Sequence, residues 1–146
     1  MPLEKVVLGE QPMLLGFDPG RDKCGVAVMG VDRQIQFNQV VQSAEVPQTI
    51  RQICQDFPIS VCVMGDQTTS AEWGDRLTQC LTDAVRLFKV DERNSSLEAR
   101  DRYWSLYPPK GIQKLIPQGM RVPPRPVDDI VAVILIERYL SRLIAD

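Results

Sequence analysis

Histidine is absent from this sequence of 146 residues. Its absence excludes Ser-His-Asp and Cys-His nucleophile systems, and it excludes the common zinc sites that include imidazole. Any chemistry must therefore use carboxylates, lysines or hydroxyls. Carboxylate sites without imidazole suit hard cations such as Mg²⁺ or Mn²⁺.

Cysteine is sparse, and long apolar runs are missing. Cys24, Cys54, Cys62 and Cys80 form no Cys-x-x-Cys pair, so we interpret them as reduced, buried thiols. The longest apolar run, residues 130–136, is far shorter than the roughly 20 residues that a helix needs to cross a bilayer. The first residues show no signal-peptide pattern. We expect a cytoplasmic protein with no membrane partner.

The chain also lacks the excess of positive charge that announces many nucleic-acid binders. It has 17 basic and 19 acidic side chains, a formal charge of −2. Any surface for nucleic acid must therefore be local. Residues 102–127 contain no acidic side chain, and several basic residues recur there among prolines. We interpret this stretch as a basic, irregular connector that contacts phosphates; a solvated loop is the alternative.

The composition is otherwise that of an ordinary globular protein, with 44% hydrophobic and 25% charged residues. A chain of this length buries enough surface for one sizeable core. There are no internal repeats, low-complexity tracts or linkers. We expect a single domain over residues 1–146.

The first 60 residues predict three antiparallel strands followed by a helix. Apolar residues 13–17 and 25–31 flank an Asp-Pro-Gly turn, which indicates a hairpin. Residues 34–42 alternate between polar and apolar, which indicates a third strand with one wet face. A proline at position 47 and apolar residues at helical spacing predict an amphipathic helix that ends near Pro58.

The rest of the chain alternates between strand and helix. Residues 60–65 predict a buried strand, and a helix carrying Trp73 and Leu77 follows. Residues 85–90 could continue that helix or form a fifth strand.

Two further helices complete the predicted order. The pattern Ser95-x-x-Glu98 predicts a capping box that opens a third helix, whose apolar face includes Leu97, Trp104 and Tyr107. A last helix begins near Asp128 and is apolar on nearly all sides, which indicates a central, buried position.

This order predicts a three-layer α/β fold with a five-stranded mixed sheet flanked by helices. In such sheets ligands gather at the carboxyl ends of strands. Those ends and the start of the last helix supply Asp18, Asp66, Asp91, Glu92, Asp128 and Asp129. Carboxylates at several strand ends, without histidine, are what a magnesium-dependent phosphodiester site would require.

Three blocks of sequence, in order across nearly the whole chain, resemble the YqgF (RuvX) family of the RuvC-like branch of the RNase H fold. The first is LLGFDPG at 14–20, continuing to GVAV at 25–28. The second is DERNSSLEA at 91–99, and the third is VDDIVAVILIERYL at 127–140. The chain departs from the family pattern in its Asp-Pro-Gly opening, in Lys23-Cys24, and after the fourth strand, where Gly65-Asp66-Gln67-Thr68-Thr69 replaces a Gly-Leu-Pro loop.

The resemblance implies an RNase H-like nuclease of the kind described as Holliday-junction resolvases or as nucleases acting on precursor ribosomal RNA. It implies that Asp18, Glu92 and Asp128 are catalytic and bind Mg²⁺ or Mn²⁺. Asp66 is a second candidate for the third carboxylate, ranked behind Glu92 because Glu92 lies in the better-matched block. Branched DNA or structured RNA would be the partner, and a homodimer fits because resolvases often dimerise. The candidate phosphate contacts are Lys23, Arg93, Lys110, Lys114, Arg121 and Arg125.

Each candidate carboxylate also has a structural alternative. Asp18 is typical of a turn aspartate that bonds its own backbone. Asp128 is typical of a helix N-cap, which contributes about 1 kcal/mol. Glu92 could pair with a neighbouring cation in solvent, and Asp66 could simply begin a loop.

Two other functions compete with the nuclease. One is a catalytically degenerate RNase H-like module that binds nucleic acid or acts as a scaffold. The other is an actin-like phosphotransferase, for which the chain is too short to supply a second lobe.

Overall fold

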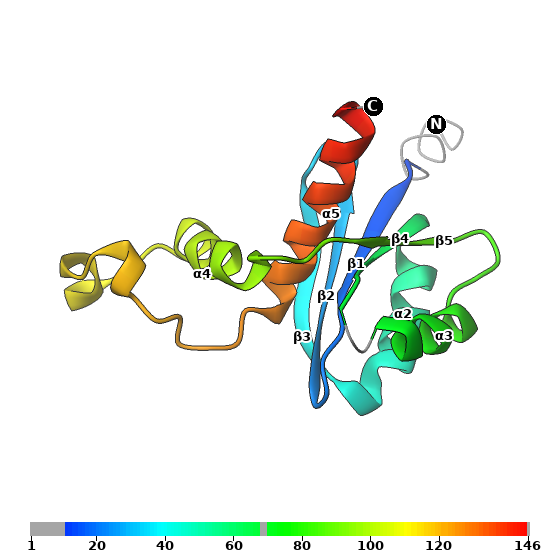
Figure 1. The fold of residues 1–146 in the computed structure, drawn as a ribbon, viewed down its shortest axis with the longest axis horizontal. Coiled ribbons are helices and arrows are strands. Elements are labelled where there is room, and N and C mark those ends of the chain that lie inside the picture. The colour runs from blue at the N-terminus through cyan, green and yellow to red at the C-terminus, as the bar shows by residue number, and fades with distance from the viewer. Residues whose placement is uncertain (1–10, 68–69, 146) are drawn as a thin grey trace, which may run out of the picture.

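The computed structural model describes residues 11–67 and 70–145, which form a five-stranded mixed sheet with helices on both faces (Figure 1). The strands are β1 (Met13–Asp18), β2 (Lys23–Gly30), β3 (Ile35–Gln42), β4 (Ile59–Gly65) and β5 (Arg86–Val90). Their order across the sheet is β3-β2-β1-β4-β5. The first three are antiparallel, and β1, β4 and β5 run parallel. The predicted fold class is confirmed.

The sheet separates two hydrophobic cores, because successive side chains of a strand point to opposite faces. Leu15 and Phe17 of β1 pack toward α2 (Val46–Asp56) and α3 (Ser70–Cys80), with the short helix η1 (Ser43–Glu45) leading into α2. Leu14 packs on the other face, under α4 (Ser95–Leu106) and α5 (Asp128–Ala145). Asp18 has the same parity as Leu14 and therefore lies on the α5 face.

Helix α5 crosses the centre of the sheet. Every residue of its apolar run, 130–136, is buried, as the all-round hydrophobic pattern predicts. The helix approaches β1 very closely at Gly16, where a Cβ would overlap the carbonyl oxygen of Ala132. A glycine at this strand position lets the helix lie directly on the backbone of the sheet.

The ambiguous stretch before Asp91 is strand β5. Helix α3 ends at Cys80, and β5 pairs in parallel with β4. Leu87 packs on the α3 side, whereas Val90 belongs to the core beneath α5. This alternation of faces is the reason that the segment is a strand rather than a continuation of the helix.

The predicted capping box at the start of α4 is wrong. The residue before the helix is Asn94, in the left-handed conformation (φ 61°) and without a side-chain capping bond. The Glu98 carboxylate instead accepts a hydrogen bond from Arg138 of α5 at 2.8 Å. The glutamate thus links two helices rather than closing its own first turn.

The predicted apolar face of α4 is wrong at two of its three positions. Trp104 is buried, but Leu97 is 62% exposed, and Tyr107 lies beyond the helix end and is 43% exposed. The buried face instead includes Ala99 and Tyr103, which pack in the core beneath α5. Helix α4 is only weakly amphipathic, so spacing alone could not identify this face.

Residues 107–127 connect α4 to α5 and project away from the sheet as an arm (Figure 1, yellow to orange). The arm contains two short 3-10 helices, η2 (Gly111–Leu115) and η3 (Gln118–Met120), in the stretch expected to be irregular. Thr68 and Thr69 of the loop after β4 lie outside the described residues. Within the described part of the chain, no helix is both long and apolar enough to cross a membrane.

Candidate functional site

The acidic site is built at the carboxyl ends of three parallel strands. Asp18 is the last residue of β1, Gly65 ends β4, and Glu92 follows β5 by two residues. Val63 and Val90 belong to the core on the α5 face, so Gly65 and Glu92 share the parity that places Asp18 there. The site therefore lies on one face of the sheet, beside α4 and α5.

Gly25 brings the start of α5 to this edge of the sheet. It is the β2 residue paired with Asp18, and a Cβ at Gly25 would overlap the backbone carbonyl of Asp128. The first turn of α5 thus rests on the strand pair that carries Asp18. The backbone of Asp128 therefore lies against the strand pair that carries Asp18.

Gly65 allows a similar close approach, in this case of the Glu92 side chain to strand β4. A Cβ at Gly65 would overlap the Glu92 carboxylate, so the absence of a side chain at the end of β4 makes room for it. Glu92 is only 8% exposed. A buried carboxylate held against strand β4 is not the solvent-exposed partner of a neighbouring cation that its sequence position also allowed.

Asp18 lies within electrostatic reach of two other carboxylates. Burial raises the pKa of Asp18 to about 8, and the nearby carboxylates of Asp128 and Glu92 contribute to that rise. Every one of these influences favours the protonated form of Asp18. An isolated turn aspartate would keep an ordinary pKa, so the site concentrates unfavourable negative charge around this residue.

The other two carboxylates are perturbed in the same direction. Burial raises the pKa of Glu92, with Asp66 and Asp91 adding to the effect and a backbone hydrogen bond from Gln67 opposing it. Burial also raises the pKa of Asp128, which Lys23 partly lowers. All three site carboxylates are therefore destabilised as anions in the absence of a cation.

Asp66 lies at the margin of this cluster. It is exposed and acts on the pKa of Glu92, but it is not among the groups that shift the pKa of Asp18. Asp129, another carboxylate at the start of α5, points elsewhere. It is 2% exposed and accepts hydrogen bonds from Asn38 at 2.6 Å and from Arg125 at 2.9 Å.

A cavity of about 230 Å³ opens beside the carboxylates. Its walls are formed by the strand ends and the first turn of α4: Asp18, Pro19, Gln67, Glu92, Asn94, Ser95, Ser96 and Leu97. Leu97, which is exposed, forms part of this wall. The amino end of α4 carries a partial positive charge that favours anions. Asp18 and Glu92 are thus accessible to a small, charged ligand.

The donor set suits a hard divalent cation. Its oxygen atoms are those of carboxylates, of which Glu92 is buried and Asp18 and Asp128 are partly buried, and a positive ion would relieve their mutual repulsion. Among residues 11–67 and 70–145, however, no three His, Cys, Asp or Glu side chains are grouped closely enough to form a ready metal site. The carboxylates interact electrostatically without forming a preassembled cage.

The predicted basic residues have different environments. Lys23 is exposed and close enough to Asp128 to lower its pKa. Arg93, Lys110 and Lys114 are exposed as well. Arg121, by contrast, donates to two carbonyl oxygens of the arm at 3.0 and 2.8 Å.

Arg125 is also engaged within the protein. It forms an ion pair with Asp129 at 2.9 Å, and its guanidinium lies 5.4 Å from the ring centroid of Tyr103. These contacts account for Arg125 structurally. Its contact with phosphate, like that of the other basic residues, remains a prediction.

Sequence patterns did not indicate the residues that shape the site. Gly25 and Gly65 carry no chemistry, yet they admit Asp128 and Glu92. A glycine at the end of a buried strand is the pattern that could have indicated close approach of another group. Ser95 and Ser96 belong to the predicted start of a helix, but they also line the cavity.

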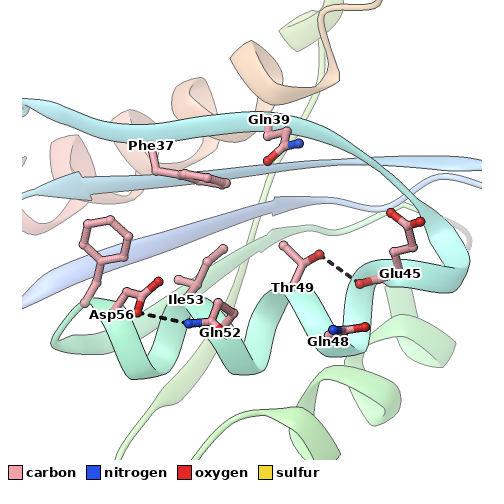
Figure 2. A pocket seen from close by; sticks show the side chains of 9 residues that line it. Phe37, Gln39, Glu45, Gln48, Thr49, Gln52, Ile53 and Asp56 are labelled. Carbon is pink, nitrogen blue, oxygen red and sulfur yellow. Dashed lines mark hydrogen bonds between the residues drawn. The ribbon is translucent and has the colours of Figure 1, made fainter.

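A larger cavity of about 610 Å³ lies between β3 and α2 (Figure 2). Its floor includes Phe37 and Ile53, which pack on the core of the opposite face of the sheet from Asp18. Two of its polar side chains are engaged locally, since Gln52 donates to Asp56 of α2 at 3.1 Å and Thr49 donates to the carbonyl of Glu45, the last residue of η1, at 2.9 Å. We assign no chemistry to this cavity.

The sheet order and the central α5 give the chain an α/β fold similar to the RNase H-like fold of RuvC. The structure of Thermus thermophilus RuvC in complex with a Holliday junction substrate matches with a TM-score of 0.60 and 14% identity, covering 90% of this chain and 95% of that one. A second structure of Thermus thermophilus RuvC matches with a TM-score of 0.59 and 13% identity, covering 91% and 96%. No family model matches the sequence, and no curated protein does.

Proposed function

We propose that this protein is a metal-dependent endonuclease that hydrolyses phosphodiester bonds in structured nucleic acid. The observation that carries the proposal is the convergence of Asp18, Glu92 and Asp128, which contributes to raising the pKa of Asp18 to about 8. Among the described residues, Asp18 is not part of a structural ion pair, because no neighbouring cation lowers its pKa. Perturbed carboxylates beside a cavity are typical of catalytic sites.

The three carboxylates would hold Mg²⁺ or Mn²⁺, with Asp66 as the alternative to Glu92. When bound, the metal would supply an activated water and stabilise the leaving oxygen. Asp18 and Glu92 face the cavity in which a phosphate would lie. The exposed ammonium of Lys23, near Asp128, would balance the charge of a flanking phosphate.

The class of substrate is supported by a likeness in sequence and a likeness in fold. The sequence blocks around Asp18, Glu92 and Asp128 resemble the YqgF (RuvX) family, and the fold resembles RuvC, one structure of which holds a Holliday junction. We therefore propose a junction resolvase-like enzyme or a nuclease for precursor ribosomal RNA, working as one domain over residues 1–146.

A cleavage assay tests the proposal. Purified protein would be incubated with a four-way DNA junction, single-stranded DNA and a structured RNA, in Mg²⁺, Mn²⁺ or EDTA. We expect metal-dependent cleavage of at least one substrate, abolished by Asp18→Asn and retained by Asp75→Asn, which removes an exposed aspartate of α3. Failure to cut all three substrates in either metal contradicts the proposal.

One observation favours a second candidate, the catalytically degenerate binding module. It is the lack, among the described residues, of three side chains grouped closely enough to form a ready metal site. Calorimetric titration with Mn²⁺ separates the two functions. Binding that Asp18→Asn abolishes supports the nuclease, whereas nucleic-acid binding without any metal binding supports the module.

A further inference from the structure

The arm, residues 107–127, presents a group of large apolar side chains to solvent. Ile112 is 79% exposed, Leu115 83%, Met120 73% and Val122 72%. Isolated exposed aliphatic residues are ordinary on a protein surface, but several on one short projecting segment mark an interaction surface.

The arm has a defined structure that keeps these side chains outward. The Arg121 Nε donates to the carbonyl oxygens of Gln113 at 3.0 Å and of Ile116 at 2.8 Å, which ties η2 to the segment after η3. The Arg121 guanidinium lies 5.7 Å from the ring centroid of the buried Trp104 in α4. The backbone N–H of Lys110 donates to the Gln113 side chain at 3.2 Å. These bonds anchor the turns without covering the apolar side chains.

The charge of the arm indicates what it contacts. All its charged residues are basic, in a chain whose formal net charge is −2. Arg121 and Arg125 are used internally, whereas Lys110 and Lys114 are exposed beside Ile112 and Leu115. A surface that mixes apolar side chains with only positive charge is complementary to a polyanion that also offers apolar faces. Nucleic acid with unstacked bases has both properties.

The arm also leads directly to the acidic site. Its last residue precedes Asp128, the first residue of α5. The arm is therefore joined to the helix that carries Asp128, and a nucleic acid would have to extend from the projecting turns to the strand ends to reach both the arm and the cavity at Asp18 and Glu92.

We propose that the arm inserts Ile112 and Leu115 between bases at a branch point of nucleic acid, while Lys110 and Lys114 contact the flanking phosphates. The inference deepens the proposed function and rests on it, because it assumes a nucleic-acid substrate. Apolar wedges enter base steps at the cost of unstacking them, and that cost is lowest where stacking is already interrupted. The arm would thus select branched over continuous duplex.

A fluorescence binding experiment in EDTA tests this selection without cleavage. The probes are a four-way DNA junction with 2-aminopurine at the branch point and a linear duplex with 2-aminopurine in the same sequence; a second pair is made in RNA. We expect the wild type to bind junctions about tenfold more tightly than duplexes and to raise the junction fluorescence. Ile112→Ser with Leu115→Ser should lose both effects and keep its affinity for duplex.

Leu143→Ser with Ile144→Ser is the matched control, because it removes another exposed Leu and Ile pair, near the end of α5. It should behave as the wild type. Unchanged junction affinity and fluorescence in the arm variant would overturn the inference. So would a shift from dimer to monomer in light scattering with unchanged junction binding, which would assign the arm to a second copy of the chain. If junction selection persists but no substrate is cut in Mg²⁺ or Mn²⁺, only the nuclease proposal fails.

Discussion

The raised pKa of Asp18 distinguishes this residue from an ordinary turn aspartate. Its burial and its two carboxylate neighbours, Asp128 and Glu92, all favour its protonated form. We predict that Asp18→Asn abolishes metal-dependent cleavage, because the variant lacks a charged ligand for a hard cation. The melting temperature at neutral pH should not fall, since a carboxyl group with a pKa of about 8 is mostly protonated there and asparagine replaces it with a neutral group of nearly the same shape. Cleavage at the wild-type rate by a folded Asn variant would exclude Asp18 from the site.

The raised pKa of Asp18 has a consequence for stability. Its pKa is about 8 in the fold, whereas an unfolded aspartate has a pKa of about 3.9. Between these values the folded state holds a proton that the unfolded state has released, so the free energy of unfolding decreases as pH rises. The stabilisation is complete below pH 4 and disappears as pH rises through 8.

We predict that the metal-free wild type becomes less stable relative to Asp18→Asn by up to about 1.4 kcal/mol per pH unit across that window. Thermal melts of both proteins in EDTA from pH 4 to pH 9 measure the difference. Saturating Mn²⁺ should restore the wild type at high pH, because an ion that binds only the folded state stabilises it. Parallel melting curves for the two proteins would show that Asp18 has an ordinary pKa.

Glu92 and Asp66 compete for the third ligand position, and their environments differ. Glu92 is buried against Gly65 and acts on Asp18, whereas Asp66 is exposed and acts on Glu92. We predict that Glu92→Gln lowers cleavage and Mn²⁺ affinity by at least tenfold and that Asp66→Asn lowers them far less. Both substitutions are nearly isosteric, so charge is the property compared. The reverse ranking in calorimetry and cleavage would place the third ligand on Asp66.

At the level of the elements, hydrophobic patterning predicted most of the fold. It predicted the hairpin, the third and fourth strands and the central α5, because each has a clear period or an unbroken apolar run. It left β5 open, since five residues are too few to distinguish strand from helix without the neighbouring β4. It failed at α4, where Glu98 bonds to Arg138 on another helix, an interaction that depends on tertiary packing.

The acidic residues of the site were predictable by type and position, but their arrangement was not. Convergence of Asp18, Glu92 and Asp128 depends on close approaches at Gly25 and Gly65. Such approaches join segments that are far apart in the chain, and the hydrophobic periodicity of a single helix or strand does not predict them. For the same reason the sequence could not separate Asp128, which raises the pKa of Asp18, from Asp129, which accepts a hydrogen bond from Asn38.

The two glycines should respond differently to an added methyl group. At Gly25 the Cβ meets the backbone of α5, which cannot move without displacing the helix. We predict that Gly25→Ala lowers the free energy of unfolding by about 1–3 kcal/mol or more. At Gly65 the Cβ meets the flexible end of Glu92, so Gly65→Ala should cost little stability but lower cleavage by displacing that carboxylate.

Gly74→Ala is the control for both glycine variants, because its Cβ would meet nothing nearer than 3.6 Å. It should retain wild-type stability and cleavage. Denaturant unfolding and cleavage rates, measured on all three variants, give the comparison. Equal losses of cleavage and of stability in Gly65→Ala would mean that the glycine serves packing alone.

At the scale of the whole molecule, positive charge is distributed unevenly rather than in excess. The formal net charge is −2, yet every charged residue of the arm is basic. We expect the acidic site on its own to repel a polyanion, and the basic arm to offset that repulsion. Affinity for nucleic acid should therefore depend on the arm more than on the rest of the surface.

We predict that Lys110→Ala with Lys114→Ala weakens binding of nucleic acid and flattens its salt dependence. Removing one lysine–phosphate interaction reduces the slope of log K against log salt by about one, so the double variant should differ from the wild type by about two. Affinities for the same four-way junction, measured in EDTA at several salt concentrations, give the slopes. Arg51→Ala with Arg86→Ala removes two exposed charges from α2 and the start of β5 and should leave the slope unchanged. If the arm and control variants change the slope equally, the molecule binds nucleic acid through its overall field, and the arm has no special role in binding phosphates.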